Sequence, residues 1–569
     1  MKKIKYFFIF SVFYFQITNC GGKMPSEMAD MVLINGNIAT MDKSNPRAEA
    51  VAVKDDIIID VGSNRQIDRY VDTDVTKIID LEERLVIPGF IDAHVHFEGG
   101  GSSLMEVRLN GVTELEEIQR RVKEKVDEVG DGVWIDGGGW DHEILPGGKW
   151  PAKELIDAVA PKNPVVLSRV DGHSALVNNL VLKISGITKD TPDPHAGKIV
   201  KDPITGGPTG ILKESATRLI KRPKLSEKEQ YNNKKKAIKL ALQEAARFGV
   251  TSLHNLTGNF DIFQELLDEG ELTVRIYACA NLTKNSETLM KYKQQQKNFS
   301  NNNNMIKLGL LKGFIDGTLG SGTASFFKPY NDDPTTTGLP TMTQNELDDL
   351  VAFADREGFQ IGIHAIGSKG NNMVLNAYED ALRINGRRDS RHRIEHAQVL
   401  IPEDIHRFAE LGVIASMQPT HCITDKRFAE KRIGKDRCKG AYAWKSLLNA
   451  DAKIAFGTDW PVEPLNPMEG LYAAVTRKDR KGEPGDGWFP EEKISMEKAI
   501  ELYTLGSAYA SFEEDIKGSI EKGKLADIVV LSQDLFEIPE DKIMDTKVVY
   551  TIIGGKIIYS SIAGSGSKK

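Results

Sequence analysis

The tripeptide His94-Val95-His96 presents two imidazoles at a spacing that suits a shared metal ion. It ends a run over residues 90–96 that is rich in β-branched and aromatic residues, which predicts a buried strand. Residues i and i+2 of a strand point to the same face, so both imidazoles project toward the same space. Two histidines at a strand end can also make ordinary hydrogen bonds, so the meaning of the pair depends on its surroundings.

Seven further apolar segments follow the histidine pair, and most are preceded by stretches with the amphipathic spacing of helices. Eight strands that alternate with helices predict an α/β fold, the (β/α)8 or TIM barrel. The chemistry of that barrel takes place at the C-terminal ends of its strands. The seven segments cover residues 249–256, 274–282, 308–317, 359–367, 392–399, 412–421 and 452–460.

The predicted strands carry polar residues at the positions where metal ligands belong. Lys312 lies in the fourth strand, His364 ends the fifth, His396 lies in the sixth, His421 ends the seventh and Asp459 ends the eighth. Histidine and aspartate are potential ligands, and a lysine becomes one when its amine is carboxylated. Each residue alone could be a hydrogen-bonded core residue or part of a turn. Their joint placement at one rim predicts a metal site.

The regions outside the barrel fall into an insertion and two flanks. About 140 residues, roughly 97–236, separate the first predicted strand from the second, far more than an ordinary connection. They predict a subdomain inserted on the catalytic face of a barrel domain that covers residues 85–517. Residues 30–84 and 518–560 are rich in short strands and turns, which predicts a small β-sandwich built from both termini.

Composition and charge narrow the class of protein. The 569 residues are 40% hydrophobic and 27% charged, as in ordinary globular proteins, and too many for one simple core. The net charge of −7 and the even scatter of lysine and arginine predict no binding to nucleic acid. A serine hydrolase is disfavoured because the chain has no GxSxG sequence. No feature of the sequence indicates an oligomeric state.

The first 20 residues have the layout of a signal peptide. Lysines precede a short apolar run that ends near Ile17, and Cys20 follows. The segment resembles a bacterial lipoprotein signal, which implies a lipidated Cys20 as the mature N-terminus and a location in the cell envelope, with membrane contact only through that lipid. Asn19 departs from the usual residue before the cysteine, and a plain secretory peptide or an uncleaved anchor is the alternative.

The ordered motifs of the chain resemble the amidohydrolase superfamily, specifically the amidohydrolase family 3 branch that includes N-substituted formamide deformylases. One departure is Ser368, where this branch usually has Asp after HAIG. The motifs are VIPGFIDAHVHF, GWDHEILPGGKWPAKELIDAVAPKNPVVLSRVDGHSALVNN, GGPTGILKES, KGFIDGTLGSGTA, IHAIG, RIEHAQ, SMQPTH, FGTDWPVEPLNP and GSIEKGKLADIVVL.

The resemblance implies roles for these residues. His94, His96 and Asp459 would bind one metal, while a carboxylated Lys312, with His364 and His396, would hold a second ion or complete a single expanded site. These nitrogen and oxygen ligands suit zinc or another divalent ion, which activates water for hydrolysis.

Asp459 is then expected to take a proton from the attacking water and return it to the leaving nitrogen. His173 and His421 are candidates for contacting the substrate or its carbonyl oxygen, with fold-supporting hydrogen bonds as the alternative.

These residues predict a metal-dependent hydrolase that cleaves a carbon–nitrogen bond other than a peptide bond in a small amide-like molecule, such as an amide, formamide or cyclic imide. A deaminase or esterase of the same superfamily is the first alternative, and a lipid-anchored binding protein without turnover is the second.

Overall fold

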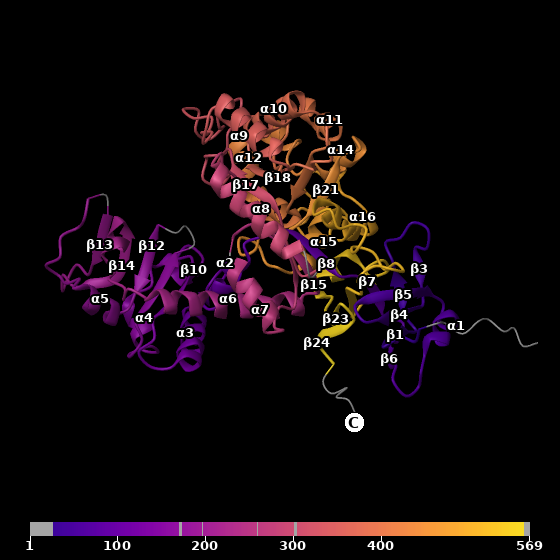
Figure 1. Cartoon of the computed structure of the whole chain (residues 1–569). Helices are drawn as coiled ribbons and strands as arrows, with labels where there is room; N and C mark the ends of the chain where they lie inside the picture. Colours follow the sequence, from indigo (N-terminus) through magenta and orange to yellow (C-terminus); the bar gives the residue numbers. More distant parts are fainter. Residues whose placement is uncertain (1–26, 170–172, 196, 259, 301–303, 563–569) are drawn as a thin grey trace, which may run out of the picture.

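The central feature of the protein is a barrel of eight parallel strands (Figure 1), seen in a computed structural model that describes residues 27–562 except 170–172, 196, 259 and 301–303. Each strand pairs with its predecessor in the chain, and a bridge between Val95 and Trp460 joins the last strand region to the first. The predicted (β/α)8 barrel is therefore confirmed. Its strands are β8 (Phe90–Val95), β15 (Val250–Asn255), β16 (Arg275–Asn281), β17 (Ile306–Phe314), β18 (Gln360–Ala365), β19 (Arg393–His396), β20 (Ile414–Met417) and β21 (Lys453–Phe456).

Helices between the strands pack their apolar faces onto the barrel and share one large hydrophobic core with it. Two of them begin with a capping box. The side chains of Ser226 and Thr343 accept from the backbone N–H three residues later, and the Glu at that position accepts from the backbone N–H of the capping residue. Such caps fix where the helices start. The helices include α6 (Glu227–Arg247), α7 (Phe260–Asp268), α8 (Ser286–Ser300), α9 (Gln344–Arg356), α10 (Ser368–Asn385), α11 (Pro402–Leu411), α12 (Pro419–Ile433), α14 (Trp444–Asn449), α15 (Pro467–Thr476), α16 (Met496–Leu502) and α17 (Leu505–Ala510).

The insertion after the first barrel strand forms a subdomain of its own, at the left of Figure 1. Its six-stranded sheet has its own hydrophobic cores, and α2 (Phe97–Leu104) and α6 connect it to the barrel. The buried face of α6 begins at Ala237, and from Ile238 onward it belongs to the barrel core, while the end of the insertion near residue 236 stays a prediction. The sheet order is β13 (Gly197–Lys201), β14 (Pro208–Glu214), β12 (Ser174–Val177), β11 (Val165–Arg169), β10 (Ile135–Trp140) and β9 (Val107–Arg108), with helices α3 (Leu115–Val129), α4 (Lys153–Asp157) and α5 (Asn179–Ser185).

Both chain ends build a pair of facing sheets, as the strand-rich flanks predict. One contains β5 (Ile57–Gly62), β4 (Ala50–Lys54), β1 (Met31–Ile34) and β6 (Lys77–Asp80). The other contains β24 (Lys556–Ser560), β23 (Val548–Ile553), β22 (Ile528–Leu531), β7 (Leu85–Pro88), β2 (Asn37–Ala39) and β3 (Arg47–Ala48). Strand β7 pairs with β2 and β22, so residues 85–88 lie in this sandwich and the barrel itself begins at Phe90.

The described part of the chain contains no helix that is both long and apolar enough to cross a membrane. Cys20 and the predicted signal segment lie outside the described residues. Their processing stays a prediction.

Candidate metal centre

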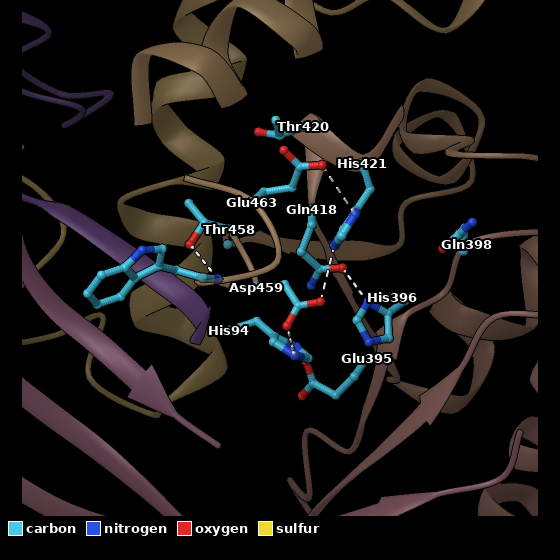
Figure 2. A network of polar contacts seen from close by, with 12 residues as sticks. His94, Glu395, His396, Gln398, Gln418, Thr420, His421, Thr458, Asp459 and Glu463 are labelled. Atoms are coloured by element: carbon cyan, nitrogen blue, oxygen red, sulfur yellow. Dashed lines mark hydrogen bonds and ion pairs between the residues drawn. The ribbon is translucent and has the colours of Figure 1, made fainter. Parts of the chain in front are cut away.

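Three potential ligands converge at the C-terminal rim of the barrel (Figure 2). His94 comes from β8, His396 ends β19, and Asp459 follows β21 by three residues. One ligand atom from each of the three lies within 4.8 Å of the others, and all three residues are buried. The strand order therefore brings together residues that are far apart in sequence, as the barrel prediction requires.

Two of these residues have a left-handed backbone. The φ angle is +75° at His396 and +60° at Asp459, and Ala397 also has a positive φ. Non-glycine residues adopt this conformation at a cost of about 1–3 kcal/mol and do so most often at functional sites. Glu395 and His396 are consecutive and would point to opposite faces of a regular strand. Both nevertheless lie beside His94, because the backbone turns at His396.

The Asp459 segment is fastened to the first barrel strand by the backbone. Asp459 N–H donates to the His94 carbonyl at 2.7 Å, and His96 N–H donates to the Trp460 carbonyl at 2.9 Å. The buried carboxylate of Asp92 accepts from the backbone N–H and the hydroxyl of Thr458, at 2.9 and 2.6 Å. These bonds close the barrel at the point where the candidate ligands meet.

The Nε2 atom of His94 is the observation that best tests whether the site fits a metal ion. It is fully buried and has no hydrogen-bond partner among the described residues. It lies 3.4 Å from Oδ1 of Asp459. A buried polar atom without a hydrogen bond costs free energy, and a cation held between Nε2 and the Asp459 carboxylate would satisfy both atoms. The donor set of imidazole nitrogen and carboxylate oxygen suits a divalent ion such as zinc.

The other predicted ligands lie around this group. His96 Nε2 is 3.3 Å from Oδ1 of Asp459. The His364 ring centroid is 4.5 Å from that of His396, and its Nε2 lies 3.1 Å from the Gly317 carbonyl oxygen. The structure brings both histidines to the same cavity as His94.

Lys312 lines the same cavity and is buried. Its ammonium lies 4.4 Å from the centre of the Phe314 ring, and it has no ion pair with a carboxylate in the described part of the chain. Burial lowers the pKa of the Lys312 ammonium, although Glu395 and Asp459 oppose that shift. The side chain therefore lies in the cavity that the candidate ligands line, and its carboxylation stays a prediction.

His421 contacts the other oxygen of Asp459. Its Nε2 lies 3.1 Å from Oδ2, and its Nδ1 lies 3.9 Å from Oε1 of Glu463. Burial disfavours the imidazolium, but Asp459 outweighs burial and raises the pKa of His421 to about 9. Burial likewise opposes ionisation of Asp459, yet His94 and His421 hold the pKa of the carboxyl well below its usual range.

The position of His421 corrects one detail of the sequence interpretation. Strand β20 ends at Met417, and His421 lies in the first turn of α12 instead of at the strand end. Pro419 explains the difference, because proline suits the first turn of a helix and cannot donate to a strand ladder.

His173 lies on the insertion, directly before β12. Its side chain is 67% exposed, and its Nδ1 lies 3.1 Å from Oε2 of Glu214. His173 is not among the described residues that line the metal-site cavity. The structure therefore does not bring it to the other candidates, and its role in catalysis stays a prediction.

Sequence reasoning missed the residues that hold the histidine rings. Glu395 Oε2 lies 2.7 Å from His94 Nδ1, and Gln418 Oε1 lies 2.7 Å from His396 Nδ1 (Figure 2). Their only sequence signal is position, since Glu395 precedes His396 in RIEHAQ and Gln418 precedes the proline in SMQPTH.

The cavity above these ligands has a volume of about 1220 Å³. Phe314 and Val462 give it apolar walls, with 49% and 66% of their surfaces exposed. Arg108, Arg427 and Lys481 add positive charge, and the carboxylates of Asp425, Glu463 and Asp479 line the same cavity. The insertion contributes Arg108 together with Asn110 and Gly111.

Comparison with known proteins agrees with the fold. The profile of the amidohydrolase family matches residues 77–559. The chain belongs to the amidohydrolase family. The matched residues cover the barrel, its insertion and about half of the terminal sandwich, and the match confirms the resemblance inferred from the motifs.

Several full-length relatives resemble this amidohydrolase. The Arabidopsis thaliana protein LONG AFTER FAR-RED 3 is 37% identical over 94% of the chain and 92% of its own length. The putative amidohydrolase YtcJ of Bacillus subtilis is 32% identical over 92% of the chain and 98% of its own length. The N-substituted formamide deformylase of Arthrobacter pascens is 24% identical over 94% of the chain and 99% of its own length.

A solved structure of an uncharacterized metal-dependent hydrolase from Pyrococcus horikoshii also resembles this chain. It is 29% identical with a TM-score of 0.70, over 90% of this chain and 99% of that one. The similarity extends beyond the barrel to the whole architecture.

Proposed function

We propose that this amidohydrolase is a metal-dependent hydrolase of a carbon–nitrogen bond other than a peptide bond, in an amide, a formamide or a cyclic imide. The observation that carries the proposal is the buried group of His94, His396 and Asp459, whose His94 Nε2 has no hydrogen-bond partner among the described residues. The group opens into a cavity large enough for a small organic substrate.

Zinc is the ion that the donor set suits best. His94, His96 and Asp459 would hold it, and Lys312 in its carboxylated form, with His364 and His396, would hold a second ion or complete one site. A bound divalent ion lowers the pKa of a water ligand to about 7 and polarises a carbonyl group.

Asp459 and His421 are the residues that would move the proton. The Asp459 carboxylate is ionised at neutral pH, because its neighbouring histidines lower its pKa, and it can accept a proton from the attacking water. His421 holds Oδ2 of Asp459 through its Nε2–H, and this contact keeps the carboxylate oriented. Asp459 can then return the proton to the leaving nitrogen.

The cavity walls indicate what the substrate carries besides the scissile bond. Phe314 and Val462 offer an apolar surface. Arg108 and Arg427 offer positive charge and form no ion pair among the described residues, although Asp425, Glu463 and Asp479 line the same cavity. These features favour a substrate with an apolar body and an anionic group away from the reacting bond.

The relatives support the reaction class in a general way. One is described as an N-substituted formamide deformylase and another as a putative amidohydrolase. Both names point to amide-type bonds, and we extend that bond type to this chain as part of the proposal.

The test is hydrolysis of a panel by the zinc-loaded protein. The panel contains N-formyl amines, N-acyl amines and cyclic imides, each as a neutral compound and as a matched compound that carries a carboxylate. Esters and amino-substituted heterocycles test the esterase and deaminase alternatives. We expect the wild type to release amine or formate and the Asp459→Asn variant to release neither. The control variant Asp451→Asn changes an exposed aspartate outside the cavity and should keep the activity. Turnover of esters alone, ammonia release from heterocycles alone, or binding without turnover would each contradict the proposal.

A further inference from the structure

A buried carboxylate contacts His94 on the side opposite to the metal position. Glu395 Oε2 lies 2.7 Å from His94 Nδ1, and the two side chains are 0% and 1% exposed. They come from β19 and β8, which are not neighbours in the barrel sheet. The contact therefore spans the barrel interior.

This contact determines which nitrogen of His94 carries the proton. An ionised carboxylate only accepts hydrogen bonds, so Nδ1 must be the N–H donor of the ring. A neutral imidazole then has its lone pair on Nε2. That atom is the one that lies 3.4 Å from Oδ1 of Asp459 and has no hydrogen-bond partner among the described residues.

Glu395 is in turn held by a buried guanidinium. Arg393 lies two residues earlier on the same strand and therefore points to the same face. Its Nη2 lies 3.0 Å from Oε1 of Glu395, an ion pair without hydrogen-bond geometry, and its Nη1 is 2.7 Å from Nδ1 of His254 on β15. The side chains of Arg393 and Glu395 are both fully buried, so each charge depends on the other.

We propose that Glu395 and Arg393 are positioning residues for the metal centre: Glu395 holds the Nδ1–H form of His94 so that Nε2 faces the ion, and Arg393, anchored on His254, holds Glu395. The inference rests on the proposed metal centre. A carboxylate behind a ligand histidine also makes its ring a stronger donor, and loss of such a partner typically weakens metal binding by about 10–100-fold.

A second buried carboxylate–histidine pair lies at the other end of the barrel. Asp355 Oδ1 lies 3.0 Å from Nε2 of the buried His392. This carboxylate–histidine pair resembles the pair of Glu395 and His94. Neither Asp355 nor His392 is among the described residues that line the metal-site cavity. A purely structural role predicts similar consequences for both pairs, whereas the proposal predicts that only Glu395 affects metal binding.

The experiment measures zinc affinity by competition with a chromogenic chelator, together with the visible spectrum of the cobalt-loaded protein. We expect Glu395→Gln to weaken zinc binding by about 10–100-fold and to change the cobalt spectrum. Asp355→Asn is expected to leave both readouts as in the wild type. Because Glu395→Gln leaves the charge of Arg393 unpaired, Glu395→Asp is measured beside it: it keeps the negative charge but is one methylene shorter and moves away from His94.

The outcomes separate this inference from the proposed function. Folded Glu395→Gln or Glu395→Asp protein with wild-type zinc affinity and cobalt spectrum would overturn the positioning role and leave the hydrolase proposal intact. If Glu395→Gln does not fold, the Glu395→Asp result decides. Wild-type protein that binds no zinc would instead overturn the metal centre itself, and the inference with it.

Discussion

The two carboxylate oxygens of Asp459 contact different histidines. Oδ2 lies 3.1 Å from His421 Nε2, while Oδ1 faces His94 and His96 at 3.4 and 3.3 Å. The left-handed backbone at Asp459 and its N–H bond to the His94 carbonyl fix this orientation. One oxygen is therefore available to a metal ion and the other is paired with a histidine that can hold a proton.

Removing His421 should slow the reaction more than it weakens metal binding. In His421→Asn, Asp459 Oδ2 loses its donor, and we expect kcat to fall by about 100-fold or more, the lower end of acid–base contributions. Zinc content should stay near the wild-type value, because His421 faces Oδ2 only. The measurement is kcat and zinc per chain, with the exposed His406→Asn as control. An unchanged kcat would remove His421 from the mechanism.

Removing Lys312 should lower metal occupancy. We expect Lys312→Ala to weaken metal binding by at least about tenfold, because its amine would be lost from the cavity wall beside His364 and His396. Lys307→Ala is the control on the same strand, since Lys307 donates to the Ser511 carbonyl instead. The measurement is metal content after dialysis. Unchanged occupancy and rate would show that Lys312 is not a ligand.

The Asp355 cluster predicts how stability depends on pH. Burial opposes ionisation of Asp355, but His392, Asn385 and Arg388 outweigh it and lower the pKa of the carboxyl to about 2. Because the folded pKa is below the unfolded value of 3.8, the stabilisation is complete above about pH 4 and is lost as the pH falls toward 2. It amounts to about 2 kcal/mol.

The check is the melting temperature of the wild type and Asp355→Asn between pH 2.5 and 6. The variant should be less stable at pH 6, and the difference should shrink as the pH falls below 4. Asp389→Asn, at an exposed aspartate, serves as the control. A difference that stays constant across this range would show that the Asp355 charge contributes nothing.

We also propose that the chain is anchored to the cell envelope by a lipid on Cys20. Cys20→Ser should move the protein from the membrane fraction to the soluble fraction without changing its zinc content, since the metal ligands lie far along the chain. Fractionation of expressing bacteria with immunoblotting measures this. If wild type and variant fractionate alike, lipidation of Cys20 is excluded as the anchor.

The sequence was sufficient for the barrel because buried parallel strands are continuous apolar runs. Their C-terminal ends meet at one rim, which is why the grouping of His94, His396 and Asp459 could be predicted from their positions in the chain. All eight predicted strands are present, with ends that differ by a few residues.

The residues that hold the site could not be predicted in the same way. The contact between His94 and Glu395 joins residues 301 positions apart through the barrel interior, and no local pattern encodes it. The orientation of His396 depends on its left-handed backbone, which breaks the strand alternation. The position of His173 depends on how the insertion packs, and this is set by contacts across the whole subdomain.

Anomalous diffraction at the zinc edge, from crystals of the zinc-loaded protein, tests the proposed metal centre most directly. We expect a strong peak beside His94 Nε2, His96 and Asp459 Oδ1, with any second peak beside Lys312, His364 and His396. Well-ordered crystals with stoichiometric zinc and no anomalous peak at this rim of the barrel would contradict the proposed metal centre.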